Sequence, residues 1–209
     1  MARSPLDILF IAADNALRTL AGRTVAGRPT PGPRGDRELN ADERRHSAGL
    51  MRVNHAGEIC AQALYAGQSL VARDAKVREA LEHAGAEERD HLAWCRDRLA
   101  ALDSRPSALD PLWYAGSFAL GVVSGIAGDR WSLGFLVETE RQVEKHLDGH
   151  LEQMPADDHA SRAVVFQMRE DEIRHGRSGE SLGAQPLPLP VRVAMRLASK
   201  VMTRSAYWV

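Results

Sequence analysis

Two short motifs have the residue types and spacing of a metal site: Glu88-x-x-His91 and Glu172-x-x-His175. Residues three apart on an α-helix share a face, so each motif can direct a carboxylate and an imidazole at the same ion. One acid precedes each motif at nearly the same distance along the chain. These two acids are Glu58 and Glu140. Four carboxylates and two imidazoles in this order form a ligand set with which a four-helix bundle holds two metal ions in its core.

Each of these acids interrupts a helical face that carries no other charge. The residues that share a face with Glu140 at a spacing of 3.6 are Leu133, Leu136, Val143, Leu147 and Leu151. Glu138 falls on a separate polar stripe, so we interpret it as a solvated acid. We expect Glu87 and Asp171, which neighbour the motif acids, to point away from these faces. An unpaired carboxylate in an apolar interface is costly, so each acid on an apolar face needs compensation.

The six inward-facing side chains can either bind metal ions or hydrogen-bond to one another. A single Glu-x-x-His motif is common by chance and favours a purely structural Glu–His pair. Two such motifs with matched upstream acids favour metal, because four carboxylates repel one another in a dry core and two imidazolium groups offset only part of that charge. Oxygen-rich ligation with one imidazole per ion suits iron or manganese better than zinc.

Composition limits the class of protein. The 209 residues carry a formal net charge of −1, which disfavours a nucleic-acid partner. Two cysteines are too few for a disulfide scaffold and favour a reducing compartment. Asp7 and Asp14 interrupt the apolar residues that a secretory signal would need. The uncharged stretch 111–128 contains four glycines and is a poor bilayer span.

Periodicity and capping residues predict an all-α protein with two regions. Residues 1–38 comprise an amphipathic helix at 2–22 and a flexible linker rich in glycine and proline. Residues 39–209 are expected to form a four-helix bundle, with an additional weakly apolar helix and a C-terminal amphipathic helix. The helices expected in this second region span about 40–73, 74–102, 110–128, 129–153, 157 or 158 to 179, and 191–207. Asp110 is expected to cap the third of them, and residues 185–190 are expected to be extended.

Several runs of sequence carry a resemblance to a known family. They are Met51-Arg-Val-Asn-His-Ala-Gly-Glu58, Tyr65-Ala-Gly-Gln68, Glu87-Glu-Arg-Asp-His91, Val137-Glu-Thr-Glu140 followed by His146, and Glu170-Asp-Glu-Ile-Arg-His175. With them, the chain resembles the demethoxyubiquinone hydroxylases, ferritin-like di-iron monooxygenases of ubiquinone biosynthesis, over about residues 40–207. The Arg-Val-Asn-His-Ala-Gly-Glu run is far more specific than Glu-x-x-His.

The resemblance implies a catalytic centre of two iron ions per chain. Its ligands would be Glu58, Glu88 and His91 mainly for one ion, and Glu140, Glu172 and His175 for the other, with some carboxylates bridging. The implied reaction is the O2-dependent hydroxylation of the ring of a polyprenylated demethoxy-benzoquinol. The resemblance also suggests NADH as reductant, directly or through the quinone, although the sequence has no Gly-x-Gly-x-x-Gly fingerprint.

A substrate with a polyprenyl tail lies in a bilayer, so the resemblance predicts peripheral attachment to the cytoplasmic side of the cell membrane. Two segments are suited to it. One is the weakly apolar helix near 112–126, and the other is the C-terminal helix, which has a basic residue at every fourth position from Arg192 to Arg204. The alternative is that both pack on the bundle or form a subunit contact. A homo-oligomer or a partner protein of ubiquinone biosynthesis is also expected.

Two other functions remain open at this point. One is a different ferritin-like di-metal oxidase or peroxidase, and the other is a non-enzymatic lipid-binding helical bundle with structural Glu–His pairs. His55 lies one turn before Glu58 and either orients a ligand or packs between helices. We interpret His146 and His150 as surface residues, with contact to substrate or reductant as the alternative.

Overall fold

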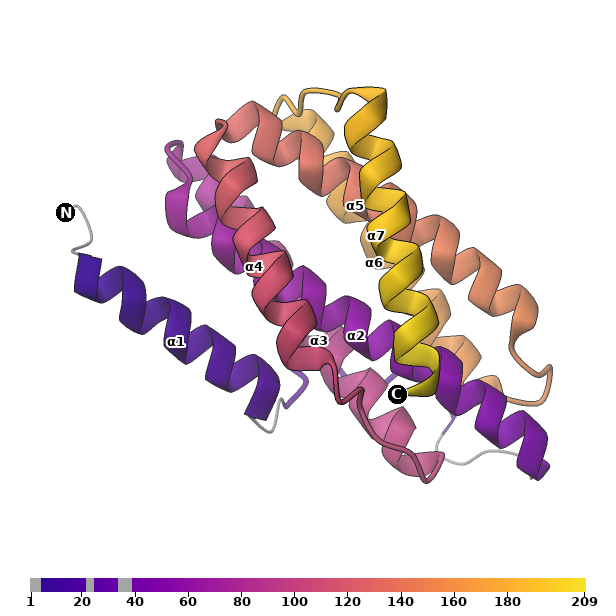
Figure 1. Ribbon diagram of the computed structural model, residues 1–209. Helices are drawn as coiled ribbons and strands as arrows, with labels where there is room; N and C mark the ends of the chain where they lie inside the picture. Colours follow the sequence, from indigo (N-terminus) through magenta and orange to yellow (C-terminus); the bar gives the residue numbers. More distant parts are fainter. Residues whose placement is uncertain (1–4, 22–24, 34–38) are drawn as a thin grey trace.

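The computed structural model describes residues 5–21, 25–33 and 39–209, and these residues form seven helices and no strand (Figure 1). The helices are α1 (Pro5–Ala21), α2 (Ala41–Val71), α3 (Ala75–Ala101), α4 (Asp110–Ile126), α5 (Asp129–Gln153), α6 (His159–Ser181) and α7 (Leu189–Trp208). The prediction of an all-α fold is confirmed. The expected start of the first helix at residue 2 and parts of the expected linker lie outside the described residues. The division of the chain at residue 38 stays a prediction.

Side-chain caps start three of the four long helices. Asn40 Oδ1 accepts a 3.0 Å hydrogen bond from the Glu43 amide, and the Glu43 carboxylate accepts one of 2.9 Å from the Asn40 amide. This reciprocal pair is the predicted capping box. Asp74 caps α3. Asp158, rather than Asp157, starts α6 by accepting a 3.0 Å hydrogen bond from an amide of the first turn.

The predicted cap at Asp110 is wrong. Asp110 is the first residue of α4, and Leu109 occupies the cap position without a side-chain hydrogen bond. The Asp110 carboxylate is buried, and its Oδ2 lies 3.1 Å from Nδ1 of His55 on α2. The Asp110 carboxylate therefore contacts His55 of another helix instead of capping the start of α4.

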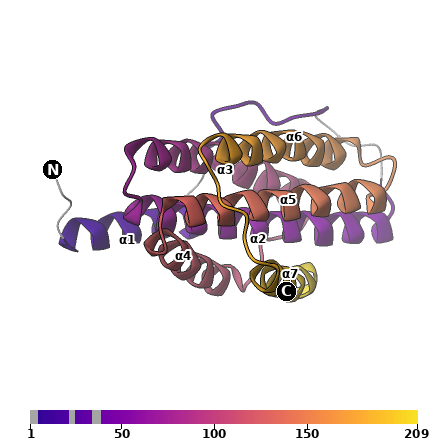
Figure 2. The ribbon, with the colours of Figure 1, turned by 90° about the horizontal axis from the view of Figure 1, so that it is seen from above.

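Two antiparallel hairpins, α2–α3 and α5–α6, make the four-helix bundle. Figure 2 shows α2 and α5 in one layer and α3 and α6 in the other, with α4 and α7 together on the outer side of the α2–α5 layer. α1 lies beside α2 and α4. The predicted additional helix and C-terminal helix are thus α4 and α7.

The two largest apolar clusters of the protein lie in the bundle core. One includes Met51, Trp94 and Met168, and the other includes Tyr65 and Leu81. The six candidate ligands lie close to these clusters. On each bundle helix they fall between, or directly beside, the positions that build the clusters. The polar residues are therefore enclosed along the bundle axis by close-packed side chains that keep water away.

α4 approaches α2 closely at paired glycines. A Cβ atom on Gly121 would lie 2.3 Å from the Leu64 carbonyl oxygen, and one on Gly67 would lie 2.5 Å from the Phe118 carbonyl oxygen. Neither position has room for a side chain, so the glycines allow the two backbones to meet. This contact fixes one part of α4 against the bundle.

Residues 25–33 have no regular secondary structure but lie across α3 and α6 (Figure 2). The Gly27 amide donates a 2.6 Å hydrogen bond to Asp90 of α3. Gly32 has a φ of 91°, and a Cβ atom there would lie 2.7 Å from that of Ala163 on α6. The composition predicts a flexible linker, whereas the structure holds this part against the bundle. Glycines permit the close approach, and prolines lower the entropy lost when the segment is ordered.

Candidate metal centre

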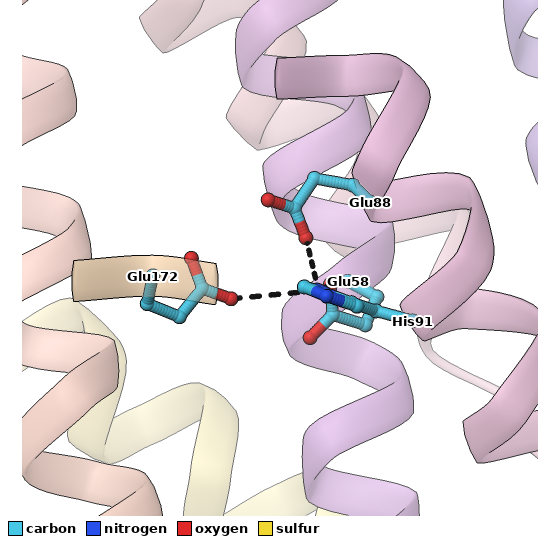
Figure 3. A group of neighbouring side chains, drawn as sticks. All are labelled: Glu58, Glu88, His91 and Glu172. Carbon is cyan, nitrogen blue, oxygen red and sulfur yellow. Dashed lines mark hydrogen bonds and ion pairs between the residues drawn. The ribbon is translucent and has the colours of Figure 1, made fainter. Parts of the chain in front are cut away.

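The six predicted ligands come together in the middle of the bundle as two overlapping clusters. One consists of Glu58, Glu88, His91 and Glu172, and the other of Glu88, Glu140, Glu172 and His175. Within each cluster, one donor atom per residue lies within 4.8 Å of all the others, and every residue is buried. Figure 3 shows the side chains of the first cluster converging from three helices. Glu88 and Glu172 belong to both clusters, so they are placed to bridge two ions.

Both imidazoles direct Nδ1 at the carboxylates. His91 Nδ1 lies 2.8 Å from Glu88 Oε2, 3.6 Å from Glu172 Oε1 and 3.7 Å from Glu58 Oε2. His175 Nδ1 lies 3.0 Å from Glu88 Oε1 and 3.6 Å from Glu172 Oε2. Each oxygen of Glu88 therefore faces a different imidazole, and the carboxylate lies between the two nitrogen donors.

Several buried atoms of the two clusters that could bind a metal make no hydrogen bond within the described part of the chain. They are Glu58 Oε2, Glu88 Oε1, Glu140 Oε1 and His175 Nδ1. Buried polar atoms normally have a partner, because leaving one unsatisfied costs about 1–3 kcal/mol. Oxygens and an imidazole nitrogen that converge on the same space fit a pair of divalent cations, so the site can hold metal ions.

Two acids of the centre resist ionisation. Burial raises the pKa of the Glu58 carboxyl well above its usual value, and the Glu88 carboxylate raises it further. Burial and the Glu172 carboxylate act in the same way on the pKa of Glu140. Without a cation beside them, both carboxyl groups therefore favour the protonated form.

Glu88 and the two imidazoles favour one another's charged forms. Burial opposes the charge on Glu88, but the two adjacent imidazolium groups hold its pKa well below the usual value. Burial also opposes protonation of the imidazoles, yet Glu88 and the surrounding acids raise the pKa of His91 well above its usual value. The adjacent carboxylates of Glu172 and Glu88 raise the pKa of His175 to about 12. A metal ion must displace these protons, so its affinity falls as the pH falls.

Glu140 and Glu138 differ in their partners rather than in burial. Glu140 is 2 % exposed and faces the centre, as predicted. Glu138 belongs to neither cluster, but the interpretation of it as a solvated acid is wrong, because it is only 6 % exposed. Its carboxylate accepts hydrogen bonds of 2.9 Å from Arg192 on α7 and 2.8 Å from Gln142. The periodicity of one helix does not show that another helix covers its polar stripe.

The prediction that Glu87 and Asp171 point away from the ligand-bearing faces is only partly confirmed. Neither joins the clusters, but each contacts the outer nitrogen of the other motif's histidine. Asp171 Oδ2 lies 2.8 Å from His91 Nε2, and Glu87 Oε2 lies 2.7 Å from His175 Nε2. A carboxylate in this position orients the ring and makes it a stronger metal ligand. The sequence signal is that both motifs have an additional acid directly before the glutamate.

The remaining histidines lie outside both clusters. His55 is buried against Asp110. The interpretation of His146 and His150 as surface residues is wrong, because His150 is 4 % exposed and His146 lines a cavity. Their ring centres lie 3.9 Å apart. Burial lowers the pKa of His146 to about 4, and burial together with neighbouring histidines lowers that of His150 to about 2.

A cavity of about 310 Å³ leads to the centre from the side of α4 and α7. Glu58, Glu140 and Glu172 line its inner end. Most of the remaining wall is apolar and comes from α2, α4, α5 and α7, including Leu64, Trp113, Leu120, Phe135, Val143 and Met195. A second cavity of about 250 Å³ reaches Glu87 and His175 from between α3, α5 and α6. The centre is therefore approached by an apolar path on one side and a more polar one on the other.

An all-α bundle with paired carboxylate–histidine clusters in its core defines a class of metal-binding helical bundles. Residues 45–206 match the family described as "Ubiquinone biosynthesis protein COQ7". The chain therefore belongs to the COQ7 family, as the resemblance implies.

Relatives with high similarity extend over nearly the whole chain. A protein of Bordetella petrii is 56 % identical over 209 residues, covering 99 % of this chain and 93 % of its own length. One of Cupriavidus pinatubonensis is 58 % identical over 205 residues, covering 97 % and 99 %. One of Burkholderia pseudomallei is 57 % identical over 204 residues, covering 97 % and 98 %. Each of these relatives is named 3-demethoxyubiquinol 3-hydroxylase.

Proposed function

We propose that the protein is an O2-dependent monooxygenase that hydroxylates the ring of a polyprenylated demethoxyubiquinol in ubiquinone biosynthesis. Two iron ions would be held by Glu58, Glu88, His91, Glu140, Glu172 and His175. The observation that carries this proposal is the apolar cavity that ends at three of the six residues. The names of the relatives support the same reaction.

The chain's own residues would fix the ions and exclude water. When bound, two iron ions would supply the coordination positions for O2 and pass on electrons from an external reductant. Glu88 and Glu172 are shared by both clusters, and the carboxylates of Asp171 and Glu87 behind the imidazoles hold the rings in place. The apolar wall of the cavity keeps bulk water from the centre while admitting an aromatic ring.

Two polar side chains of the cavity are suited to hold the quinol ring. Asn54 Oδ1 and His146 Nε2 are buried, line the cavity and make no hydrogen bond within the described residues. His146 is neutral near pH 7 because burial lowers its pKa to about 4. Each atom can accept a hydrogen bond from a ring hydroxyl, and such bonds orient a small ligand in a largely apolar site.

The outer surfaces of α4 and α7 support peripheral attachment to the cytoplasmic side of the cell membrane. Both helices line the cavity, and both lie on one side of the bundle (Figure 2). They expose Leu120, Val123 and Ile126 from α4 and Leu197, Val201 and Trp208 from α7. α7 also exposes Arg196, Lys200 and Arg204. An apolar surface with adjacent basic residues suits an anionic bilayer. Among the described residues, no helix is long and apolar enough to cross a membrane.

We further propose that NADH is the source of electrons, directly or through the quinol. Exposed Leu6, Phe10 and Leu17 on α1 offer an apolar surface for a second copy of the chain or a partner protein of ubiquinone biosynthesis. The resemblance to the family supports both the reductant and the partner.

A reconstituted assay tests the proposed reaction. The protein is loaded with Fe(II) without oxygen, then given a short-tailed demethoxyquinol, NADH and ¹⁸O2. We expect a ring-hydroxylated product that contains one ¹⁸O atom, and no product from Glu172→Ala. A fully loaded protein that consumes O2 or peroxide without this product would be another di-metal oxidase or peroxidase. A native protein that binds no iron or manganese would be a lipid-binding bundle.

A further inference from the structure

Arg28 connects the N-terminal segment to both α3 and α6 behind the candidate metal centre. Its Nε lies 2.7 Å from Asp90 Oδ2 on α3, and its Nη1 lies 2.9 Å from Asp171 Oδ2 on α6. The guanidinium carbon also lies 4.8 Å from the centre of the Trp94 ring. The planar guanidinium group has several donors in a fixed fork, so one side chain can join two carboxylates that would otherwise repel each other.

The backbone around Arg28 is held at the same place. The Gly27 amide donates a 2.6 Å hydrogen bond to Asp90 Oδ1, the oxygen that Arg28 leaves free. The Trp94 indole donates a 3.3 Å hydrogen bond to the Arg28 carbonyl oxygen. Residues on α3 therefore fix both the main chain and the side chain of this segment.

Asp171 is the point at which this contact reaches the centre. Its Oδ2 accepts from Arg28 Nη1 and also from His91 Nε2, at 2.9 and 2.8 Å. Its Oδ1 accepts from Gln167 and Arg174. The Asp171 side chain is fully buried, whereas that of Arg28 is 34 % exposed. Asp171 Oδ2 therefore connects Arg28 directly to the His91 ring. The other nitrogen of that ring faces the three acids of the first cluster.

We propose that Arg28 is a positioning residue of the metal centre, which holds Asp171 so that the His91 ring is fixed toward the ion it binds. This inference rests on the proposed metal-dependent function. It makes residues 25–33 part of the centre. His91 belongs to only one of the two clusters, so we expect the ion on that side to depend on Arg28 more strongly than the ion beside His175, which this path reaches only through Arg174 and Glu87.

Metal titration of full-length variants tests this role. Arg28→Gln removes both contacts, Asp90→Asn weakens the anchor on α3, and the double variant combines them. Arg141→Gln is the control, because Arg141 forms an exposed pair with Glu180 on the same bundle. Fe(II) and Co(II) binding are measured, and the Co(II) absorption spectrum reports the geometry around each ion.

We expect Arg28→Gln to weaken the binding of one of the two ions by about 10–100-fold, as is typical when the partner of a ligating histidine is disturbed. Its Co(II) spectrum should change mainly for that ion. The double variant should be no weaker than Arg28→Gln alone, because both substitutions disturb one path. Arg141→Gln should bind both ions like the native protein.

The outcomes separate this inference from the proposed function. Native affinity and a native Co(II) spectrum for both ions in Arg28→Gln would overturn the inference and leave the proposed function intact. An equal loss at both ions, together with a lower unfolding temperature of the metal-free variant, would show general destabilisation and also overturn it. Absence of metal binding by the native protein would sink the proposed function itself.

Discussion

Asp171 of α6 accepts a 2.8 Å hydrogen bond from Nε2 of His91 on α3. The same relationship occurs in reverse between Glu87 of α3 and His175 of α6, at 2.7 Å. Each motif therefore supplies the carboxylate that orients the histidine of the other. The two hairpins complete each other's part of the centre, so neither half is fully assembled until α3 and α6 pack together.

Removing either of these carboxylates should weaken metal binding without abolishing it. Asp171→Asn and Glu87→Gln keep the size of the side chain but lose the charge that orients the ring and increases its basicity. We expect about 10–100-fold weaker binding of one ion in each variant, measured by metal titration. Glu180→Gln, an exposed acid on α6, is the control. Unchanged affinity in both variants would mean that these contacts do not support ligation.

Glu172 and Glu138 should affect different properties of the protein. Glu172→Ala removes a donor shared by both clusters, so we expect it to abolish metal loading. Glu138→Ala removes the partner of Arg192 and should leave loading nearly intact while lowering stability by about 1 kcal/mol. Elemental analysis after reconstitution and urea unfolding measure the two effects. Equal loss of metal in both variants would contradict the assignment of Glu140 over Glu138.

Filling the apolar cavity should block the reaction but not the metal centre. Gly57 lines the cavity, and a Cβ atom there would meet nothing within 4 Å. We expect Gly57→Leu to fold and load metal normally but to lose at least about tenfold in quinol turnover, or about 1.4 kcal/mol in the barrier. Gly67→Ala is the contrasting variant. It has no room beside the Phe118 carbonyl oxygen and should destabilise the fold by about 1–3 kcal/mol. Full turnover by Gly57→Leu would mean that the quinol uses another path.

Two buried histidines should favour unfolding as the pH falls. Burial lowers the pKa of His146 to about 4, and burial together with neighbouring histidines lowers that of His150 to about 2. The unfolded chain, with histidine pKa values near 6.5, therefore binds more protons below that pH. The contribution of these two histidines to stability should fall as the pH decreases from about 6.5 toward 4, by at most about 1.4 kcal/mol per pH unit for each histidine. The raised pKa values of Glu58 and Glu140 act in the opposite direction.

Urea unfolding of the metal-free protein between pH 7.5 and 5 measures this dependence. His150→Gln should reduce the slope, whereas His159→Gln, at an exposed position at the start of α6, should not. A slope that does not change in His150→Gln would show that other groups cause the acid sensitivity.

Charges placed on α4 and α7 should reduce binding to anionic vesicles. Val123→Glu and Leu197→Glu alter the exposed apolar surface and oppose the negative lipids. We expect about tenfold weaker binding in a flotation assay, with further weakening at high salt. Phe166→Glu is a matched control, because Phe166 is an exposed apolar residue on α6, across the bundle. An equal loss in the control would argue against an oriented membrane surface.

Local patterns determined much of the fold and the choice of the six candidate ligands. Helix starts at Asn40, Asp74 and Asp158 depend on side chains that reach amides within the next few residues, so they are encoded locally. The Glu-x-x-His spacing brings two donors to one helical face for the same reason. A carboxylate on an apolar face, such as Glu140, is also visible without coordinates.

Only the tertiary structure decided which faces are covered and by what. Glu138 is buried because α7 supplies Arg192, and Asp171 contacts His91 because α3 and α6 pack together. Arg28 reaches the centre because a segment without regular structure docks across both helices. Helical periodicity reports the direction of a side chain relative to its own axis. Its partner is set by the packing of residues distant in the chain, which no single helix encodes.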